Sequence, residues 1–134
     1  MQLPPMNGLP TQLLINNLRV DKQQVTATMP VTADHLAPTG RLHAGAIITL
    51  ADTACGYGCL AALPEHATGF ATSTITSHHI GTASTGDILA VQARCLHSGR
   101  TTQLWDATVT RQSDARAIAN VRVLQQILTG EKAP

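Results

Sequence analysis

One acidic residue interrupts the longest apolar run of this chain and constrains what that run can become. From His43 to Leu63 the sequence reads HAGAIITLADTACGYGCLAAL, in which Asp52 is the only acid and no proline occurs. A run that is apolar on all sides is typical of a helix that protein covers on every side. Burying a carboxylate there without partners costs several kcal/mol or raises its pKa. We therefore interpret Asp52 either as a catalytic group or as an acid hydrogen-bonded in a packed core or a subunit seam.

The length and the scarcity of large side chains indicate one domain that needs a partner. The 134 residues predict a single domain over residues 1–134. Tyr57, Phe70 and Trp105 are the only aromatic residues, and the apolar run consists mostly of small side chains that each bury little area. We expect a homo-oligomer, a dimer or a tetramer, in which subunit contacts complete the core.

Charge and patterning exclude several classes of protein. Nine Lys and Arg against eight Asp and Glu give a net charge of +1, so the basic stripe of a nucleic-acid binder is missing. Asp52 and three glycines make the apolar run a poor membrane span. The start, MQLPPMNGLP, lacks the basic flank and apolar core of a signal peptide, so we expect a cytoplasmic protein.

The three cysteines predict reduced thiols and no metal site. Cys55 and Cys59 lie four residues apart in the apolar run, and Cys95 leaves the set odd. Metal binding by Cys55 and Cys59 is the alternative to buried thiols, but no third ligand has a suitable spacing.

Periodicity predicts two strands, one long helix and then four strands. Residues 1–10 hold three prolines and are expected to form a loose arm. Alternation predicts a hairpin of residues 14–20 and 25–31 around the turn Asp21-Lys22, and further strands over 70–80, 88–96, 101–111 and 117–128. Short connections favour an antiparallel sheet. We predict an α+β fold in which a curved antiparallel sheet wraps around one long central helix and leaves its edges free for a second subunit.

The start of the helix is a candidate site for an oxyanion. His43 stands at the helix entrance, followed by Ala44 and Gly45, whose backbone N–H groups have no partner within the helix. Such N–H groups can polarise a carbonyl oxygen. Asp52 follows His43 by nine residues, about two and a half turns, so both could reach one substrate only if it runs along the helix.

These residues resemble a known family. Gly40-Arg-Leu-His-Ala-Gly45 with Leu50-Ala-Asp52 is similar to the HGG…(D/E) signature of hotdog-fold acyl-CoA thioesterases. The subgroup is the phenylacetic-acid-degradation type, related to 4-hydroxybenzoyl-CoA and 1,4-dihydroxy-2-naphthoyl-CoA hydrolases. The resemblance covers residues 30–128 and includes Ser77-His-His-Ile80, Thr85-Gly-Asp87 and Leu96-His-Ser-Gly-Arg100. It implies a hotdog fold that hydrolyses acyl-CoA, with an aryl or arylacetyl group favoured and no cofactor beyond the coenzyme A of the substrate.

The resemblance also implies roles for single residues. Asp52 would be the base for water or the nucleophile of a mixed anhydride. Ala44, where the family usually has Gly, would donate its backbone N–H to the thioester carbonyl, with Gly45 beside it. His43 would shape the helix entrance, and His78 would line the site, from this chain or from its partner. His79, next on the strand, should face the other side.

Two positions depart from the family pattern. Ala37 stands where an Asn or Gln often orients substrate or water, and Gly56 stands where some members have Ser or Thr. Thr53, Thr72 and Ser73 are possible substitutes in the site.

Arg100, in the Ser-Gly-Arg turn, is the candidate contact for a coenzyme A phosphate, or an ordinary exposed hairpin residue. Arg41 and Arg122 are weaker candidates. His35, His66 and His97 are expected to be structural or exposed.

Two other functions compete with hydrolysis. One is a non-catalytic acyl-CoA-binding protein on the same fold, although no DNA-binding segment or extra domain accompanies it. The other is an acyl dehydratase of hotdog type, whose acid–base pairing differs from the carboxylate arrangement found here.

Overall fold

A computed structural model describes residues 2–21 and 23–130 of the chain. Lys22 of the expected turn, Met1 of the expected arm and residues 131–134 lie outside the described residues.

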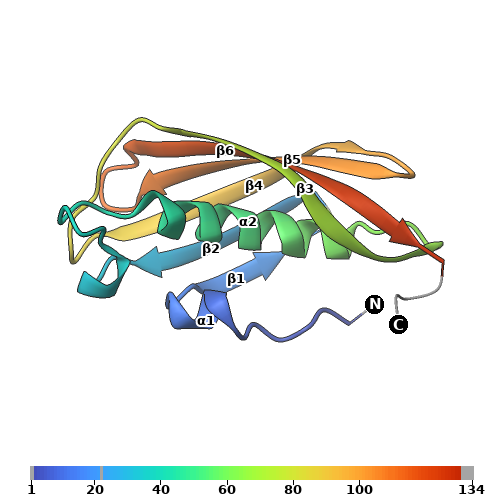
Figure 1. The fold of residues 1–134 in the computed structure, drawn as a ribbon, viewed down its shortest axis with the longest axis horizontal. Coiled ribbons are helices and arrows are strands. Elements are labelled where there is room, and N and C mark those ends of the chain that lie inside the picture. The colour runs from blue at the N-terminus through green and yellow to red at the C-terminus, as the bar shows by residue number, and fades with distance from the viewer. Residues whose placement is uncertain (1, 22, 131–134) are drawn as a thin grey trace.

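A six-stranded antiparallel sheet curls around one long helix (Figure 1). The strand order is β1-β2-β4-β5-β6-β3, and every neighbouring pair is antiparallel. The elements in chain order are α1 (Leu9–Gln12), β1 (Asn16–Val20), β2 (Gln24–Pro30), the 3-10 helix η1 (Ala33–His35), α2 (Ala44–Ala61), β3 (Ala67–His79), β4 (Ile88–Ser98), β5 (Thr102–Arg111) and β6 (Ala117–Thr129). The α+β prediction of a curved sheet around one central helix is therefore confirmed.

One face of α2 fits closely into the concave side of the sheet. Its buried residues recur at helical spacing: Ala46, Ile47, Leu50, Ala51, Ala54, Cys55, Gly58 and Cys59. Small side chains are needed here, because a Cβ on Gly58 would overlap the indole ring of the buried Trp105. α2 is long and apolar enough to cross a membrane by length and composition, yet half of it is buried within this chain, as in the core helix of a globular fold.

The opposite face of α2 is only partly covered, which corrects the expectation of a helix enclosed on every side. Ile48, Asp52, Gly56 and Tyr57 all lie on this half-exposed face. The two faces of α2 differ little in hydrophobicity, because both carry small and apolar residues. This chain alone therefore leaves one side of its central helix open.

The edge strand β3 contains an irregularity that reverses its two faces. Thr72 pairs with Gln125 and Thr74 with Leu124, so Ser73 is an extra residue, a β-bulge. Before the bulge, Thr72 faces α2; after it, the odd-numbered residues do, because Ile75, Ser77 and His79 pair with Val123, Val121 and Ala119, all three of which are buried.

The N-terminal segment differs from the loose arm expected for residues 1–10. It runs beside the C-terminal half of α2 (Figure 1) and enters α1 at Leu9. The Tyr57 hydroxyl donates a hydrogen bond to the Pro4 carbonyl at 2.8 Å, and Met6 packs against the core. The three prolines thus belong to a segment with specific contacts.

Two glutamines lie side by side on the inner face of the sheet, both fully buried, with opposite hydrogen bonding. Gln103 pairs with Gln125 across β5 and β6. The amide of Gln103 donates to the Ala62 carbonyl at the end of α2, at 3.0 Å, and accepts from Trp105 Nε1 at 2.8 Å. The Gln125 amide has no hydrogen-bond partner among the described residues. An unpaired buried amide costs stability.

This contrast gives a paired stability test. We expect Gln125→Met to raise the free energy of unfolding by about 1–3 kcal/mol, because it removes a buried polar group without partners. Gln103→Met should lower the same quantity by a similar amount, because it leaves Trp105 Nε1 and the Ala62 carbonyl unpaired. Urea denaturation of both variants measures the difference. Equal destabilisation by the two substitutions would show that Gln125 is also hydrogen-bonded.

Candidate active site

Asp52 lies on the half-exposed face of α2, beside the edge strand. The hydroxyl of Thr72 on β3 donates to Asp52 Oδ1 at 3.4 Å. The carboxylate borders a pocket of about 270 Å³ between α2, β3 and the N-terminal segment. Thr53, one of the possible polar substitutes, lines the same pocket. Asp52 is therefore neither in a sealed core nor freely exposed.

The surroundings disfavour the charge of Asp52. Burial raises the pKa of this carboxyl above its ordinary value, and the hydrogen bond from Thr72 partly opposes that rise. A carboxylate whose pKa is raised is a better base than an ordinary aspartate and remains able to ionise at the edge of the pocket.

The N-terminus of α2 leaves one backbone donor available. His43 caps the helix, and its Nδ1 accepts from the Gly45 N–H at 2.8 Å. The Ala46 N–H donates to the His43 carbonyl at 3.0 Å. Ala44 is exposed, and no described residue accepts a hydrogen bond from its backbone N–H.

In this arrangement the backbone N–H groups of Ala44 and Gly45 differ, because His43 caps only the second. The Gly45 N–H is occupied by the cap, and a Cβ there would lie 2.9 Å from His43 Nδ1, so Gly45 makes room for the capping ring. His43 shapes the helix entrance. The donor left free is that of Ala44.

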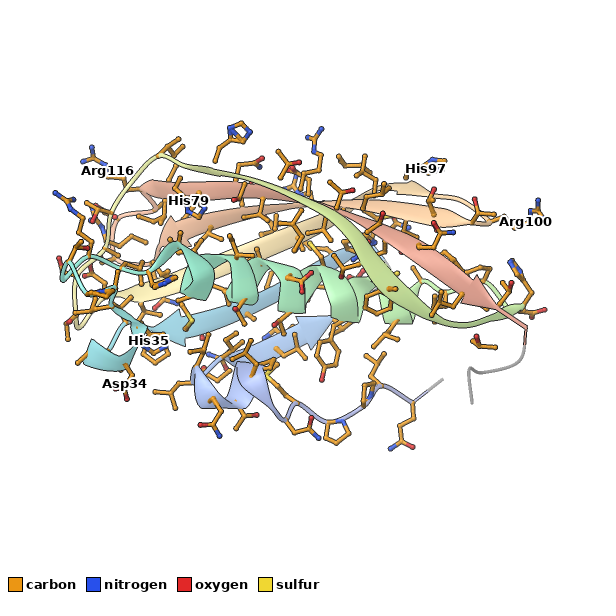
Figure 2. The ribbon with its side chains drawn as sticks, in the orientation of Figure 1. Asp34, His35, His79, His97, Arg100 and Arg116 are labelled. Carbon is orange, nitrogen blue, oxygen red and sulfur yellow. The ribbon has the colours of Figure 1, made fainter. Side chains whose placement is uncertain are left out.

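The bulge at Ser73 exchanges the two histidines of β3. His78 pairs with Asn120 and lies on the outer face of the sheet, whereas His79 faces α2, hydrogen-bonds Ser77 at 3.1 Å and lines a small pocket with Ala44 (Figure 2). Uninterrupted alternation from Thr72 would have placed His78 on the inner face. Within this chain, the bulge therefore places His79, and not His78, on the face of β3 that is turned toward α2.

The three candidate arginines lie in three different places. Arg100 is exposed in the β4–β5 turn, beyond the C-terminal end of α2 (Figure 2), and its carbonyl contacts His66 Nε2 at 3.3 Å. Arg122 pairs with Asp106 at 3.2 Å on the outer face of the sheet. Arg41 lines the small pocket with Ala44. Within one chain, Arg41 is thus the arginine beside the free backbone donor.

The two positions that depart from the family pattern have different surroundings. A Cβ on Gly56 would lie 3.2 Å from the Phe70 ring, so the glycine lets this ring approach α2 beside Asp52. Ala37 takes part in a backbone turn, accepting from the Gly40 N–H at 2.9 Å. Thr72 is therefore the polar side chain that contacts the carboxylate, and Ser73 forms the bulge next to it.

Two other histidines, His35 and His97, lie in different environments. His35 is buried, and its Nε2 donates to the Leu13 carbonyl at 2.6 Å while its Nδ1 accepts from the backbone N–H of Thr32. His97 is exposed near the β4–β5 turn (Figure 2).

Cys55 and Cys59 lie on the buried side of α2. Burial raises the pKa of Cys55, and raises that of Cys59 to about 12, so both stay protonated. Cys55, Cys59 and Cys95 are free. Within residues 2–21 and 23–130, no three His, Cys, Asp or Glu side chains are grouped closely enough to hold a metal ion.

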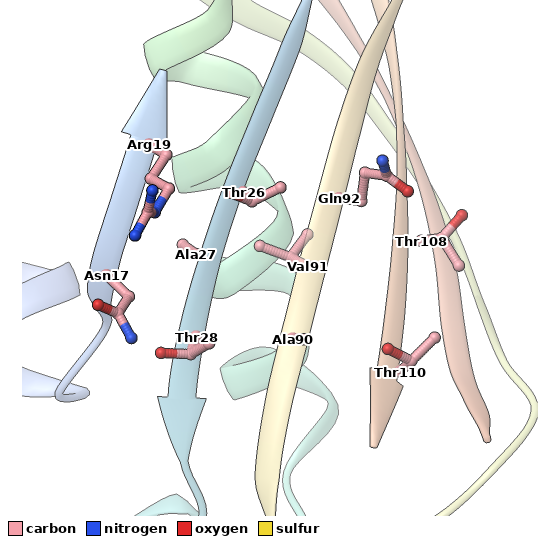
Figure 3. A pocket seen from close by; sticks show the side chains of 10 residues that line it. All are labelled: Asn17, Arg19, Thr26, Ala27, Thr28, Ala90, Val91, Gln92, Thr108 and Thr110. Carbon is pink, nitrogen blue, oxygen red and sulfur yellow. The ribbon is translucent and has the colours of Figure 1, made fainter. Parts of the chain in front are cut away.

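A larger pocket than the one at Asp52 lies elsewhere. It measures about 430 Å³ and occupies the side of the sheet turned away from α2 (Figure 3). Threonines such as Thr26 and Thr108, with Gln92 and Arg19, line it, and none of its lining residues is acidic. Chemistry therefore favours the smaller pocket at Asp52.

Comparison with known proteins gives a family and close sequence relatives. The model described as "Thioesterase superfamily" matches residues 39–118, more than half of the chain. A Pseudomonas aeruginosa protein named as an esterase is 34% identical over 89 residues, which are 64% of this chain and 59% of that protein. The acyl-coenzyme A thioesterase PaaI of Escherichia coli is 30% identical over 100 residues, 73% of this chain and 67% of the relative. The chain thus spans less than two thirds of the Pseudomonas relative.

Solved structures share the fold. Escherichia coli PaaI superposes with a TM-score of 0.80 at 26% identity, covering 90% of this chain and 84% of that one. A Streptococcus mutans protein, solved with acetyl-CoA bound, superposes with a TM-score of 0.80 at 24% identity and covers 98% of this chain and 100% of its own. These likenesses confirm the hotdog fold.

Proposed function

We propose that this chain, which belongs to the thioesterase superfamily, hydrolyses acyl-CoA thioesters to a free acid and coenzyme A. The observation that carries the proposal is the Asp52 carboxylate, which stands at the edge of a pocket with a raised pKa and a hydroxyl hydrogen bond. Family membership supplies the reaction class, and the carboxylate supplies the group that can perform it.

Asp52 has two possible roles in this reaction. As a base, it takes a proton from water while the oxygen attacks the thioester carbon; the tetrahedral oxyanion then collapses and expels the thiolate of coenzyme A. As a nucleophile, it attacks the same carbon, releases the thiolate and forms a mixed anhydride, which water then hydrolyses. Both routes need ionised Asp52 and a donor for the developing oxyanion.

The Ala44 N–H is the proposed donor, and the helix geometry favours a donor from a second chain. Ala44 and Asp52 of one chain are eight residues apart, about 12 Å along the helix axis, which is too far for both to contact one thioester group. In a symmetric dimer, Ala44 of each chain can meet Asp52 of the other. The two-fold axis would then pass near Ile48, halfway between them on the half-exposed face of α2.

The remaining assignments extend this proposal. An aryl or arylacetyl group is the favoured acyl part, and the reaction needs no cofactor. Thr72 and Ser73 stand beside Asp52 on the substrate side, and the contact of Arg100 with a coenzyme A phosphate stays a prediction. The free thiols of Cys55, Cys59 and Cys95 support the proposal of a cytoplasmic protein.

The second candidate function is binding of acyl-CoA without hydrolysis. Ala37 and Gly56 favour binding without hydrolysis. They replace the polar side chains that orient substrate or water in the family pattern. Release of free thiol from a panel of acyl-CoAs separates the two functions. Saturable binding with no thiol release above the uncatalysed rate would establish the binding protein.

Asp52→Asn tests the carboxylate. We expect the turnover number on the best acyl-CoA to fall by at least about 100-fold, because the amide cannot accept the proton or attack the carbonyl. The variant should be no less stable than the wild-type protein, since burial disfavours the ionised form of Asp52 at neutral pH. Steady-state thiol release and thermal unfolding provide the two readouts. A folded variant with near-normal turnover would refute the assignment.

Thr72→Val tests how the pKa of Asp52 is set. The Thr72 hydroxyl stabilises ionised Asp52, so its loss should raise the pKa of Asp52 further and move the acidic limb of the kcat/KM profile to higher pH. Thr72→Ser keeps a hydroxyl and is the matched control, which should leave the limb near its wild-type position. An unchanged limb in Thr72→Val would mean that the hydrogen bond does not set the pKa of the catalytic carboxylate.

A further inference from the structure

The pocket at Asp52 has a wall that the chemistry of hydrolysis does not require. Its floor comes from α2 and β3, through Tyr57, Leu60 and Phe70, and its outer wall from the N-terminal segment, through Pro4, Pro5 and Met6. All these side chains are apolar or aromatic. Asp52 is the one charged residue among those that line the pocket.

The N-terminal segment is held at this position by specific contacts. The Tyr57 hydroxyl donates to the Pro4 carbonyl at 2.8 Å, across 53 residues of sequence. The Thr11 hydroxyl donates to the Met6 carbonyl at 3.2 Å. Adjacent Pro4 and Pro5 restrict the backbone dihedrals, so few contacts suffice to fix the wall.

The position and size of the pocket indicate what it receives. An apolar pocket that begins at the catalytic carboxylate suits the acyl chain attached to the carbon under attack, whereas coenzyme A is polar and charged. A volume of about 270 Å³ holds about nine non-hydrogen atoms if each takes the roughly 30 Å³ that one water molecule occupies in the liquid. An acyl group of about eight carbons, straight or ending in a phenyl ring, has that number of non-hydrogen atoms.

We propose that the N-terminal segment forms the wall of the acyl pocket and limits the acyl group to about eight carbons, with Tyr57 as the residue that fixes this limit through Pro4. This inference rests on the proposed thioester hydrolysis and adds the substrate class. Tyr57 acts through the position of the segment and takes no part in bond making. Its loss should therefore change which acyl chains are accepted.

Acyl-chain profiles test the wall. Thiol release is measured with acyl-CoAs of two to sixteen carbons and with phenylacetyl-CoA, for the wild-type protein and Tyr57→Phe. We expect wild-type kcat/KM to be highest near eight carbons and to fall for longer chains. In Tyr57→Phe the ratio of kcat/KM for dodecanoyl-CoA over octanoyl-CoA should rise by about three- to tenfold, the effect of one hydrogen bond.

Two further variants make the result specific. Met6→Ala shortens the wall without touching the hydrogen bond and should shift the profile in the same direction. Thr68→Val removes a hydroxyl that donates to the Leu128 carbonyl at 3.3 Å, outside the pocket, and should leave the profile unchanged. An unchanged profile in both Tyr57→Phe and Met6→Ala, with an active wild-type protein, would overturn the wall and leave hydrolysis standing. Absence of thiol release from every acyl-CoA with the wild-type protein would overturn both.

Discussion

The close fit between one face of α2 and the concave side of the sheet is the interaction on which the rest of the structure depends. Small residues let the helix approach the strands, and Gly58 lies directly against the indole of Trp105. This packing fixes the rotation of the helix. It therefore also fixes which residues stay on the open face, where Asp52 meets Thr72 and the N-terminal segment closes over Tyr57. The site lies on the part of the helix that the sheet does not cover.

The proposed second subunit would explain both the open face of α2 and the free edge of β3. Six consecutive residues of β3, 71–76, are exposed, and its outer edge has no neighbouring strand in the described part of the chain. An edge of this kind favours pairing with another copy. A chain with few large side chains gains core in this way, and the same pairing would bring the free Ala44 N–H of one chain to Asp52 of the other. Stability and catalysis would then depend on one interface.

The sequence was sufficient to predict the helix, the strands and the candidate carboxylate. It was insufficient for features that depend on one extra residue in a strand or on a contact between distant segments. Alternation predicted the strands, and the isolated acid in the apolar run led to Asp52. The bulge at Ser73 leaves no signal in the Thr-rich strand, so the sequence did not show which of His78 and His79 faces α2 within one chain. The open face of α2 was missed because small residues occupy both of its faces. Inward alternation through Val121 and Val123 does indicate a buried Gln125, but only pairing in space shows that its amide lacks a partner.

The most direct measurement concerns the division of one site between two chains. Ala44 is the first residue of α2, where proline fits the helix and removes only the backbone N–H. Ala44→Pro and Asp52→Asn chains are each expected to be inactive, and their thiol release is measured alone and after co-expression in equal amounts. If each site takes its donor and its carboxylate from different chains, half of the dimers are mixed and each holds one intact site, which restores about one quarter of wild-type activity. A mixture that stays as inactive as the separate variants would contradict the shared site.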